Sequence, residues 1–356
     1  MKSFIYLEDG TKLEGKTFGV NKTVVGELVF NTGMTGYEEV LTDPSYKEQV
    51  VIMTYPLIGN YGINKKDKES STIHLKAFIV REYAKIPNHY ESYETLDQFL
   101  KEHDIPGVYD VDTRMLTKKV REKGSMKCLI TSEELKNPEA LLQDYEFPKD
   151  VVKIVSRKKK ECFPGRGIKV GILDLGLKDG IINHLQKRNC SINIYPYDTK
   201  KEEIVEDGIE VLLISNGPGD PKNCTEVIEL VKQLTGVIPI WGICLGHQIL
   251  ALALGGDTYK MKFGHRGTNH PVQDITTGKI LISSQNHGYA VEENSLPSYV
   301  EKTYMNINDN TLEGFAYPKF SIKAVQFHPE EGPGSIDGHS IFDEWLHNLK
   351  AGEDYA

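Results

Sequence analysis

Short apolar runs alternate with helix-patterned segments through the second half of the chain, and this alternation constrains the fold more than any other feature. The apolar runs lie at residues 169–175, 191–197, 210–215 and 237–244, and segments with helical spacing lie at 178–188, 223–234 and 245–254. Strands that alternate with helices form βαβ units, in which helices cover both faces of a parallel sheet. We therefore expect an α/β domain with an open, mostly parallel sheet flanked by helices.

The first half of the chain has a different texture and predicts a separate, smaller α+β domain. A chain of 356 residues is too long for one ordinary core. A basic run at residues 157–160 is followed by Pro164, Gly165 and Gly167, which indicates an exposed connector. We predict an N-terminal domain over residues 1–150, a linker over 151–167 and the α/β domain over 168–356.

Composition and charge exclude several classes of protein. The 42 Lys and Arg residues against 51 Asp and Glu give a formal net charge of −9, which argues against a nucleic-acid binder. We expect no membrane span, because no apolar segment is long enough, and no signal peptide. The five cysteines are scattered and include no CxxC pair, so we expect neither a disulfide framework nor a zinc site. A reducing cytoplasm is the expected location.

One cysteine stands between two glycines in "WGICLGHQ", residues 241–248. Cys244 follows an apolar run and precedes a helix candidate, in a G-x-C-x-G version of the strand–turn–helix that exposes a hydrolase nucleophile. A sulfur at a helix N-terminus is favoured as the thiolate, the species that attacks a carbonyl. The alternative is a buried core cysteine, which is the commoner role of a free cysteine.

A base follows another apolar run in "AVQFHPEEGPG". His328 and Glu330 are two residues apart, so an extended backbone places both on one face, and Pro329 favours that backbone. Histidine could carry the cysteine proton while Glu330 orients the ring. Glu331 is the neighbouring alternative, pointing to the opposite face, and a plain surface ion pair is the other interpretation.

The stretch "SNGPGD", residues 215–220, ends a further strand of the predicted sheet. Its glycines would let backbone N–H groups approach a developing oxyanion, together with the amide of Leu245. Taken alone, the same residues are typical of an ordinary turn.

The motifs "GICLGHQ", "SNGPGDP" and "AVQFHPE" together resemble those of the class I, triad-type glutamine amidotransferases. Within that class the chain is similar, over nearly its whole length, to the small, glutamine-hydrolysing chains of carbamoyl-phosphate synthases. That narrower resemblance rests on five stretches: "GELVFNTGMTGYEEVLTDPSY" (26–46), "TYPLIGNYGIN" (54–64), "DTRMLTK" (112–118), "KMKFGHRGTNHPV" (260–272) and "SQNHGYAV" (284–291).

The resemblance implies a role for each matching residue. Cys244 is the implied nucleophile, His328 and Glu330 complete its triad, and the amides of Gly217 and Leu245 face the oxyanion. The implied glutamine contacts are Ser45, Gly217, Gly219, Leu245, Gln248, Asn286, Gly288 and Tyr289. Two alternatives stay open: Gln248 could be a helix surface residue, and residues 286–288 a plain loop.

The resemblance also implies a partner. Ammonia from glutamine would pass to a large carbamoyl-phosphate synthase chain that uses bicarbonate and ATP, and such heterodimers could assemble further. No cofactor is expected on this chain: "GPGD" lacks the G-K-[ST] of a phosphate-binding loop, so ATP and its divalent metal are expected on the partner. The alternatives are a glutaminase for another synthetase (anthranilate or guanylate), a stand-alone cysteine hydrolase, and a non-catalytic scaffold.

Some residues depart from the family pattern or lie outside it. Asp179 and Gly180 stand where Arg-Asn is usual, and Tyr109 and Asp110 where smaller residues are usual, with effects expected on helix capping and the partner interface only. We expect the remaining histidines of interest to be structural or non-catalytic and to hold no metal: His184, His247, His265, His270 and His287.

Overall fold

The computed structural model describes residues 1–330 and 334–352, and the side chains as far as residue 349. The chain divides into two compact units, Met1–Pro148 and Lys149–Ala356, and each is described by itself. No helix in the described residues is both long and apolar enough to cross a bilayer.

The first unit is built on a closed seven-stranded barrel with the strand order β1-β2-β8-β6-β4-β3-β9. Its strands are β1 (Lys2–Leu7), β2 (Lys12–Gly19), β3 (Val24–Asn31), β4 (Gln49–Met53), β6 (Ala77–Ile79), β8 (Pro106–Tyr109) and β9 (Met126–Thr131), with a separate pair β5 (Leu57–Ile58) and β7 (Glu82–Tyr83). Its helices are α1 (Tyr37–Thr42), α2 (Leu96–Glu102), α3 (Thr113–Lys123) and α4 (Pro138–Asp144), with a 3-10 turn at Pro44–Tyr46.

Local sequence signals explain where the helices of the first unit begin. A capping box between Thr95 and Gln98 starts α2, and the Asp112 carboxylate accepts the Met115 N–H to start α3. The unusual Asp110 follows β8 with φ 62°, and its carboxylate pairs with the Lys16 ammonium at 2.9 Å. Asp110 therefore belongs to an exposed ion pair on the barrel and caps no helix.

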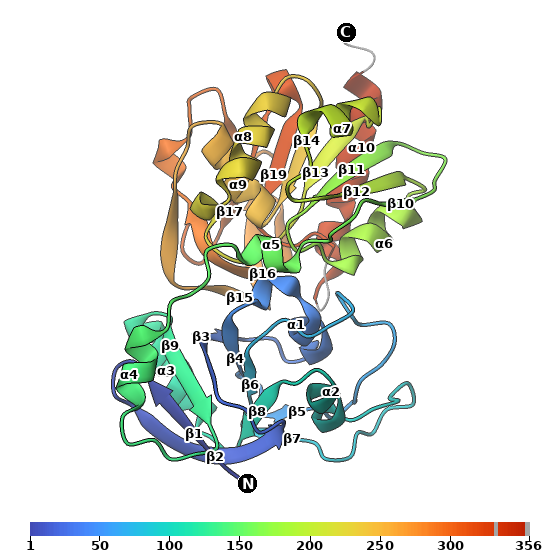
Figure 1. Cartoon of the computed structure of the whole chain (residues 1–356). Helices are drawn as coiled ribbons and strands as arrows, with labels where there is room; N and C mark the ends of the chain where they lie inside the picture. The colour runs from blue at the N-terminus through green and yellow to red at the C-terminus, as the bar shows by residue number, and fades with distance from the viewer. Residues whose placement is uncertain (331–333, 353–356) are drawn as a thin grey trace. The chain divides into compact units, whose positions relative to one another are not determined.

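The second unit is a ten-stranded mixed sheet with the order β10-β12-β11-β13-β14-β19-β18-β17-β15-β16 (Figure 1). Strands β11 (Lys169–Asp174), β12 (Ser191–Pro196), β13 (Val211–Ile214), β14 (Ile240–Ile243) and β19 (Ile322–Val325) are parallel. The antiparallel strands are β10 (Glu161–Phe163), β15 (Thr258–Asp274), β16 (Ile280–Val291), β17 (Glu301–Asn306) and β18 (Leu312–Tyr317). The predicted α/β class is confirmed.

Two hydrophobic clusters lie on opposite faces of this sheet. Leu212 and Ile214 of β13 pack in one cluster, and Val211 and Leu213 in the other, because successive strand side chains point to opposite faces. The first cluster is completed by α7 (Lys201–Glu206), α8 (Thr225–Leu234) and α9 (Leu245–Ala253), and the second by α6 (Asp179–Lys187) and α10 (Ser340–Gly352). The parallel strands are buried on both faces, which explains their continuous apolar runs.

The structure differs from the expected exposed linker over residues 151–167. This stretch contains α5 (Val151–Val155) and β10, and it belongs to the second unit. Val152 is buried in the sheet's first cluster, and Arg157 forms an ion pair with the buried Asp174 at 3.0 Å. A basic run in a sequence suggests solvated charges, but here Arg157 has a buried partner 17 residues further along the chain.

Candidate active site

Cys244 lies at the sharp turn between β14 and α9, with φ 54° and ψ −102°. Few non-glycine residues adopt positive φ, because the Cβ approaches the backbone too closely. The turn is held on both sides: the Cys244 N–H donates to Val325 O at 2.9 Å, and the Gln248 N–H donates to Cys244 O at 3.3 Å. A cysteine that only fills a core has no need of this strained turn, which is the geometry of a nucleophile elbow.

The two flanking glycines are required by close packing. A Cβ added to Gly246 would lie 2.1 Å from the carbonyl oxygen of Ile214, and one on Gly242 would lie 2.5 Å from Leu250 Cδ1. The helix N-terminus therefore sits directly against the neighbouring strand, as the glycine pattern predicted.

Substituting Gly246 with alanine should destabilise the fold strongly. The added methyl group meets a backbone oxygen that cannot move independently, so we expect a loss of at least about 2 kcal/mol in the free energy of unfolding, measured by urea denaturation. Gly278→Ala is the matched control, because that site has open space and only its φ of 73° is unfavourable, which costs about 1 kcal/mol. Equal losses in both variants would mean that β13 and α9 do not pack as described.

His328 and Glu330 come together beyond the end of β19. The imidazole Nδ1 lies 2.6 Å from Glu330 Oε1, and both residues are buried. The His328 backbone N–H donates to Ser284 O at 2.9 Å, which anchors the segment to β16. The surface-pair interpretation is therefore wrong. Glu331, the neighbouring alternative, lies outside the described residues.

The charges around this pair hold the imidazole protonated. Burial lowers the pKa of His328, but the Glu330 carboxylate and the nearby Cys244 side chain raise it to about 10. Burial raises the pKa of Glu330, but the Lys178 ammonium and His328 lower it to about 2. At neutral pH the site therefore contains an imidazolium held by an ionised carboxylate.

Lys178 is a site residue that sequence reasoning missed. Its ammonium lies 3.1 Å from Glu330 Oε1, and its side chain is 4% exposed. A lysine is almost never buried without a counter-charge, so Glu330 is the counter-charge that allows Lys178 to be buried in the site. One feature of the sequence could have indicated Lys178. It lies four residues after Asp174, at the carboxyl edge of the parallel sheet, where ligands of open α/β folds bind.

Four predicted contact residues lie on β16 and α9, the elements whose residues Asn286 and Gln248 contact the cysteine. Asn286, Gly288 and Tyr289 lie in β16, and the Asn286 carbonyl oxygen is 3.6 Å from Cys244 Sγ. Gln248 is buried in α9, and its amide nitrogen donates to Tyr289 O at 2.8 Å. Both open alternatives are therefore wrong, because Gln248 is not a surface residue and residues 286–288 form no loop.

Gly217 lies beside the first residue of α9. A Cβ on Gly217 would lie 2.9 Å from Leu245 Cδ2 and 2.2 Å from Leu175 O, so only glycine fits. Among the described residues, the backbone N–H groups of Gly217 and Leu245 find no hydrogen-bond acceptor. Gly219 adopts φ 94° and packs against Val151. The amides of Gly217 and Leu245 are thus available to a developing oxyanion.

Ser45 lies in the first unit, in the 3-10 turn Pro44–Tyr46, where its backbone N–H donates to the Asp43 carboxylate at 2.8 Å. Its assignment to glutamine rests on the resemblance alone.

Three of the histidines set aside in the sequence lie together in the antiparallel part of the sheet: His265, His270 and His287. The other two lie elsewhere, His184 in α6 and His247 in α9. His265, His287 and Glu313 each place one potential ligand atom within 4.8 Å of the others. His265 Nε2 lies 2.7 Å from the Asp309 carboxylate, and Gln285 donates to Glu313 at 2.9 Å. Burial lowers the pKa of His265, but Asp309 and Glu313 raise it to about 9. The two carboxylates therefore stabilise the charged form of the His265 imidazole.

Comparison with known proteins identifies both units. Residues 5–130 match the carbamoyl-phosphate synthase small chain, CPSase domain, and residues 171–348 match the class I glutamine amidotransferases. The chain is 47% identical to the carbamoyl phosphate synthase small chain of Oceanobacillus iheyensis, with 100% of each chain covered. It is 50% identical to that of Methanocaldococcus jannaschii, with 97% of this chain and 98% of the relative covered.

The chain belongs to the carbamoyl-phosphate synthase small chain family. The small chain of Clostridium acetobutylicum is also 48% identical, over 97% of this chain. As a member of the family, the chain is the glutamine-hydrolysing component that supplies ammonia for carbamoyl phosphate synthesis. Two alternatives from the sequence, a stand-alone hydrolase and a glutaminase serving another synthetase, are therefore set aside.

Proposed function

We propose that Cys244, His328 and Glu330 form the catalytic triad that hydrolyses L-glutamine through a cysteinyl thioester. The observation that carries the proposal is the 2.6 Å contact between His328 and Glu330, in a buried site that also holds the strained Cys244 turn. A nucleophile, a proton carrier and an orienting carboxylate are the three parts that acyl transfer requires.

The proposed steps assign each proton. Cys244 attacks the γ-carbonyl carbon of glutamine as a thiolate, and the amides of Leu245 and Gly217 donate to the oxyanion that forms. The C–N bond breaks as His328 gives its proton to the leaving nitrogen, so ammonia departs and a thioester remains. A water molecule then attacks the thioester, with His328 as base, and glutamate and the thiolate are regenerated.

The charged neighbours keep the proton carrier in place. Glu330 orients the imidazole through Nδ1, which leaves Nε2 for the chemistry. Lys178 balances the charge of Glu330 within a buried site, where an unpaired carboxylate would be costly. Gly219, Gln248, Asn286, Gly288, Tyr289 and Ser45 are the proposed contacts of the glutamine molecule.

The ammonia is proposed to pass to a large carbamoyl-phosphate synthase chain, which would use bicarbonate and ATP with its divalent metal. The match of residues 5–130 to a domain specific to small chains supports such a partner. The free thiols on all five cysteines support a reducing, cytoplasmic setting.

A chloroketone analogue of glutamine should alkylate Cys244 in preference to Cys162. Cys162 is exposed and Cys244 is 2% exposed, so accessibility alone favours Cys162. The α-amino and α-carboxyl groups of the reagent direct it to the site, and peptide mapping by mass spectrometry should find Cys244 modified in step with loss of ammonia release.

L-Glutamine should protect Cys244 from this reagent. Iodoacetamide is the control, because it lacks the amino-acid groups and should label Cys162 without loss of activity. Inactivation that tracks Cys162, or labelling of Cys244 that glutamine does not slow, would contradict the proposed site.

A further inference from the structure

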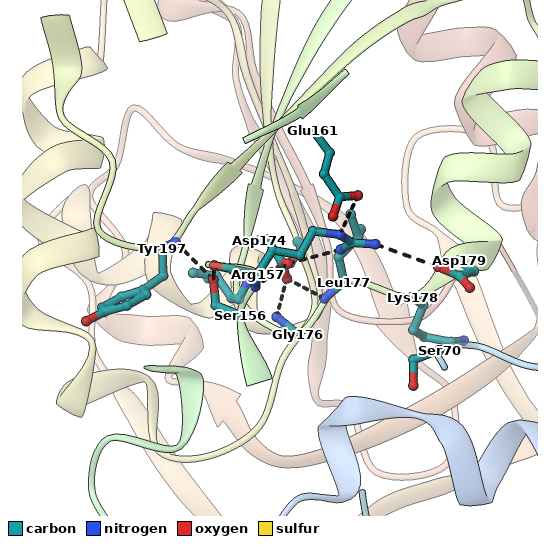
Figure 2. A network of polar contacts seen from close by, with 12 residues as sticks. Ser70, Ser156, Arg157, Glu161, Asp174, Gly176, Leu177, Lys178, Asp179 and Tyr197 are labelled. Carbon is teal, nitrogen blue, oxygen red and sulfur yellow. Dashed lines mark hydrogen bonds and ion pairs between the residues drawn. The ribbon is translucent and has the colours of Figure 1, made fainter. Parts of the chain in front are cut away.

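The Asp174 carboxylate at the end of β11 accepts four hydrogen bonds while its side chain is 1% exposed. One oxygen accepts the backbone N–H groups of Gly176 at 2.9 Å and Leu177 at 2.8 Å. The other accepts the backbone N–H of Arg157 at 2.9 Å and its guanidinium at 3.0 Å (Figure 2). This carboxylate therefore joins the incoming segment at Arg157 to the loop at residues 175–178.

Arg157 holds both ends of that loop. Besides Asp174, which precedes the loop, its guanidinium lies 3.8 Å from the Asp179 carboxylate, which follows it (Figure 2). Asp179 is one of the departures from the family pattern, and its position beside Arg157 gives it a role beyond the start of α6. A third contact, to Glu161 at 3.1 Å, lies on the exposed side of the guanidinium.

Residues that follow strand β13 also hold the 175–178 loop by hydrogen bonds. The Leu175 N–H donates to Ser215 Oγ at 2.9 Å, and the Asn216 side-chain amide donates to Gly176 O at 2.9 Å. The Lys178 N–H donates to Asn216 Oδ1 at 3.3 Å. Residues 215–216 lead directly into Gly217, so the loop connects Lys178 with the proposed oxyanion amide.

We propose that Arg157 and Asp174 are positioning residues for glutamine hydrolysis: their ion pair fixes the 175–178 loop and thereby holds the Lys178 ammonium against Glu330. This inference rests on the proposed function. Neither residue touches the substrate, and each acts through Lys178.

Arg157 mainly positions the loop, and the fold forms without its guanidinium. Its side chain is 24% exposed but that of its partner Asp174 is 1% exposed, so loss of the guanidinium lowers the stability of the fold to some extent. Loss of the guanidinium leaves Asp174 with three backbone donors, so the fold is retained. What is lost is the charged contact that limits movement of the loop, and movement of Lys178 alters the charge balance at Glu330.

Arg157→Gln in the full chain, co-purified with its large chain, should lower kcat/KM for glutamine about 3- to 10-fold, within the range that displaced positioning groups produce. The melting temperature should fall only slightly, because Asp174 keeps its three backbone donors. Lys159→Gln is the matched control: it removes the same charge from the same basic run at an exposed position and should leave kcat/KM unchanged. Arg157→Lys should restore part of the loss, and Asp174→Asn should show a larger loss in the same direction.

Two further readouts distinguish positioning from a structural role. Lys178 helps to lower the pKa of Glu330, so a displaced Lys178 lets Glu330 take up a proton at higher pH. The acid limb of the kcat/KM profile should therefore move to higher pH in Arg157→Gln and not in Lys159→Gln. In a Lys178→Met background the effect of Arg157→Gln should vanish, because the two residues act in series.

Losses that multiply in the double variant, an unmoved acid limb, or a lowered melting temperature with unchanged kcat/KM would each overturn the inference. Should Lys178→Met fail to fold, the comparison of the acid limbs of Arg157→Gln and Lys159→Gln still decides. Failure of the proposed function has a separate sign: ammonia release from glutamine would survive Cys244→Ser, whatever Arg157 does.

Discussion

A Cys244→Ser complex should lose glutamine-dependent carbamoyl phosphate synthesis by about 10³-fold or more and retain synthesis from added ammonium salts. Serine is nearly isosteric with cysteine and keeps the strained turn, so the fold is preserved. Its hydroxyl is a far weaker nucleophile than a thiolate. Carbamoyl phosphate formation from glutamine and from ammonium chloride, measured on the same preparation, checks the expectation.

The ammonium reaction serves as the internal control. It reports on the partner's own chemistry and on the integrity of the complex, so it should stay within about 2-fold of wild type if Cys244 acts on glutamine alone. Parallel loss of both reactions would mean that Cys244 is structural. Carbamoyl phosphate made by this chain without any partner would overturn the division of labour between two chains.

His328→Asn should reduce ammonia release by about 10³-fold, because it removes the proton carrier from both half-reactions. Glu330→Gln should leave a measurable rate, reduced by about 10- to 100-fold, because an orienting group contributes less than the group that moves the proton. Glutamine hydrolysis at saturating substrate measures both. Small, equal effects from the two changes would show that the buried pair has no part in the chemistry.

Lys178 requires one more variant in that series. Glu330→Gln leaves the Lys178 ammonium buried without its partner, and an uncompensated buried charge is destabilising in its own right. The double variant Glu330→Gln with Lys178→Met removes both charges and separates the two causes. A double variant that recovers the stability but not the rate of Glu330→Gln would assign the lost rate to the orienting carboxylate.

The turn at Cys244 and the buried His328–Glu330 pair, which make up the proposed triad, could be predicted from the sequence because each is specified by nearby residues. Gly242 and Gly246 mark a turn that only small residues permit, and Cys244 lies between them. His328 and Glu330 are two residues apart, and an extended backbone brings their side chains to one side. Parallel strands end at the same edge of the sheet, which brings the two motifs together.

The missed features depend on contacts between residues far apart in sequence. Lys178 pairs with Glu330 across more than 150 residues of chain, and no periodicity indicates such a pair. In the sequence, Arg157 is one of several basic residues expected to be solvated, and only the structure places the buried Asp174 carboxylate beside it. The barrel of the first unit was likewise predicted only as α+β, because short strands specify their partners weakly.

The packing of α5 and Arg157 also determines where this polypeptide can be divided. A fragment starting at residue 168, the first residue after the composition boundary, would omit Val152 from the sheet's hydrophobic cluster and remove two of the four donors to Asp174. A fragment starting at Lys149 keeps both. For a gene fusion or a split version of the enzyme, the natural junction is therefore at Pro148, ahead of the basic run.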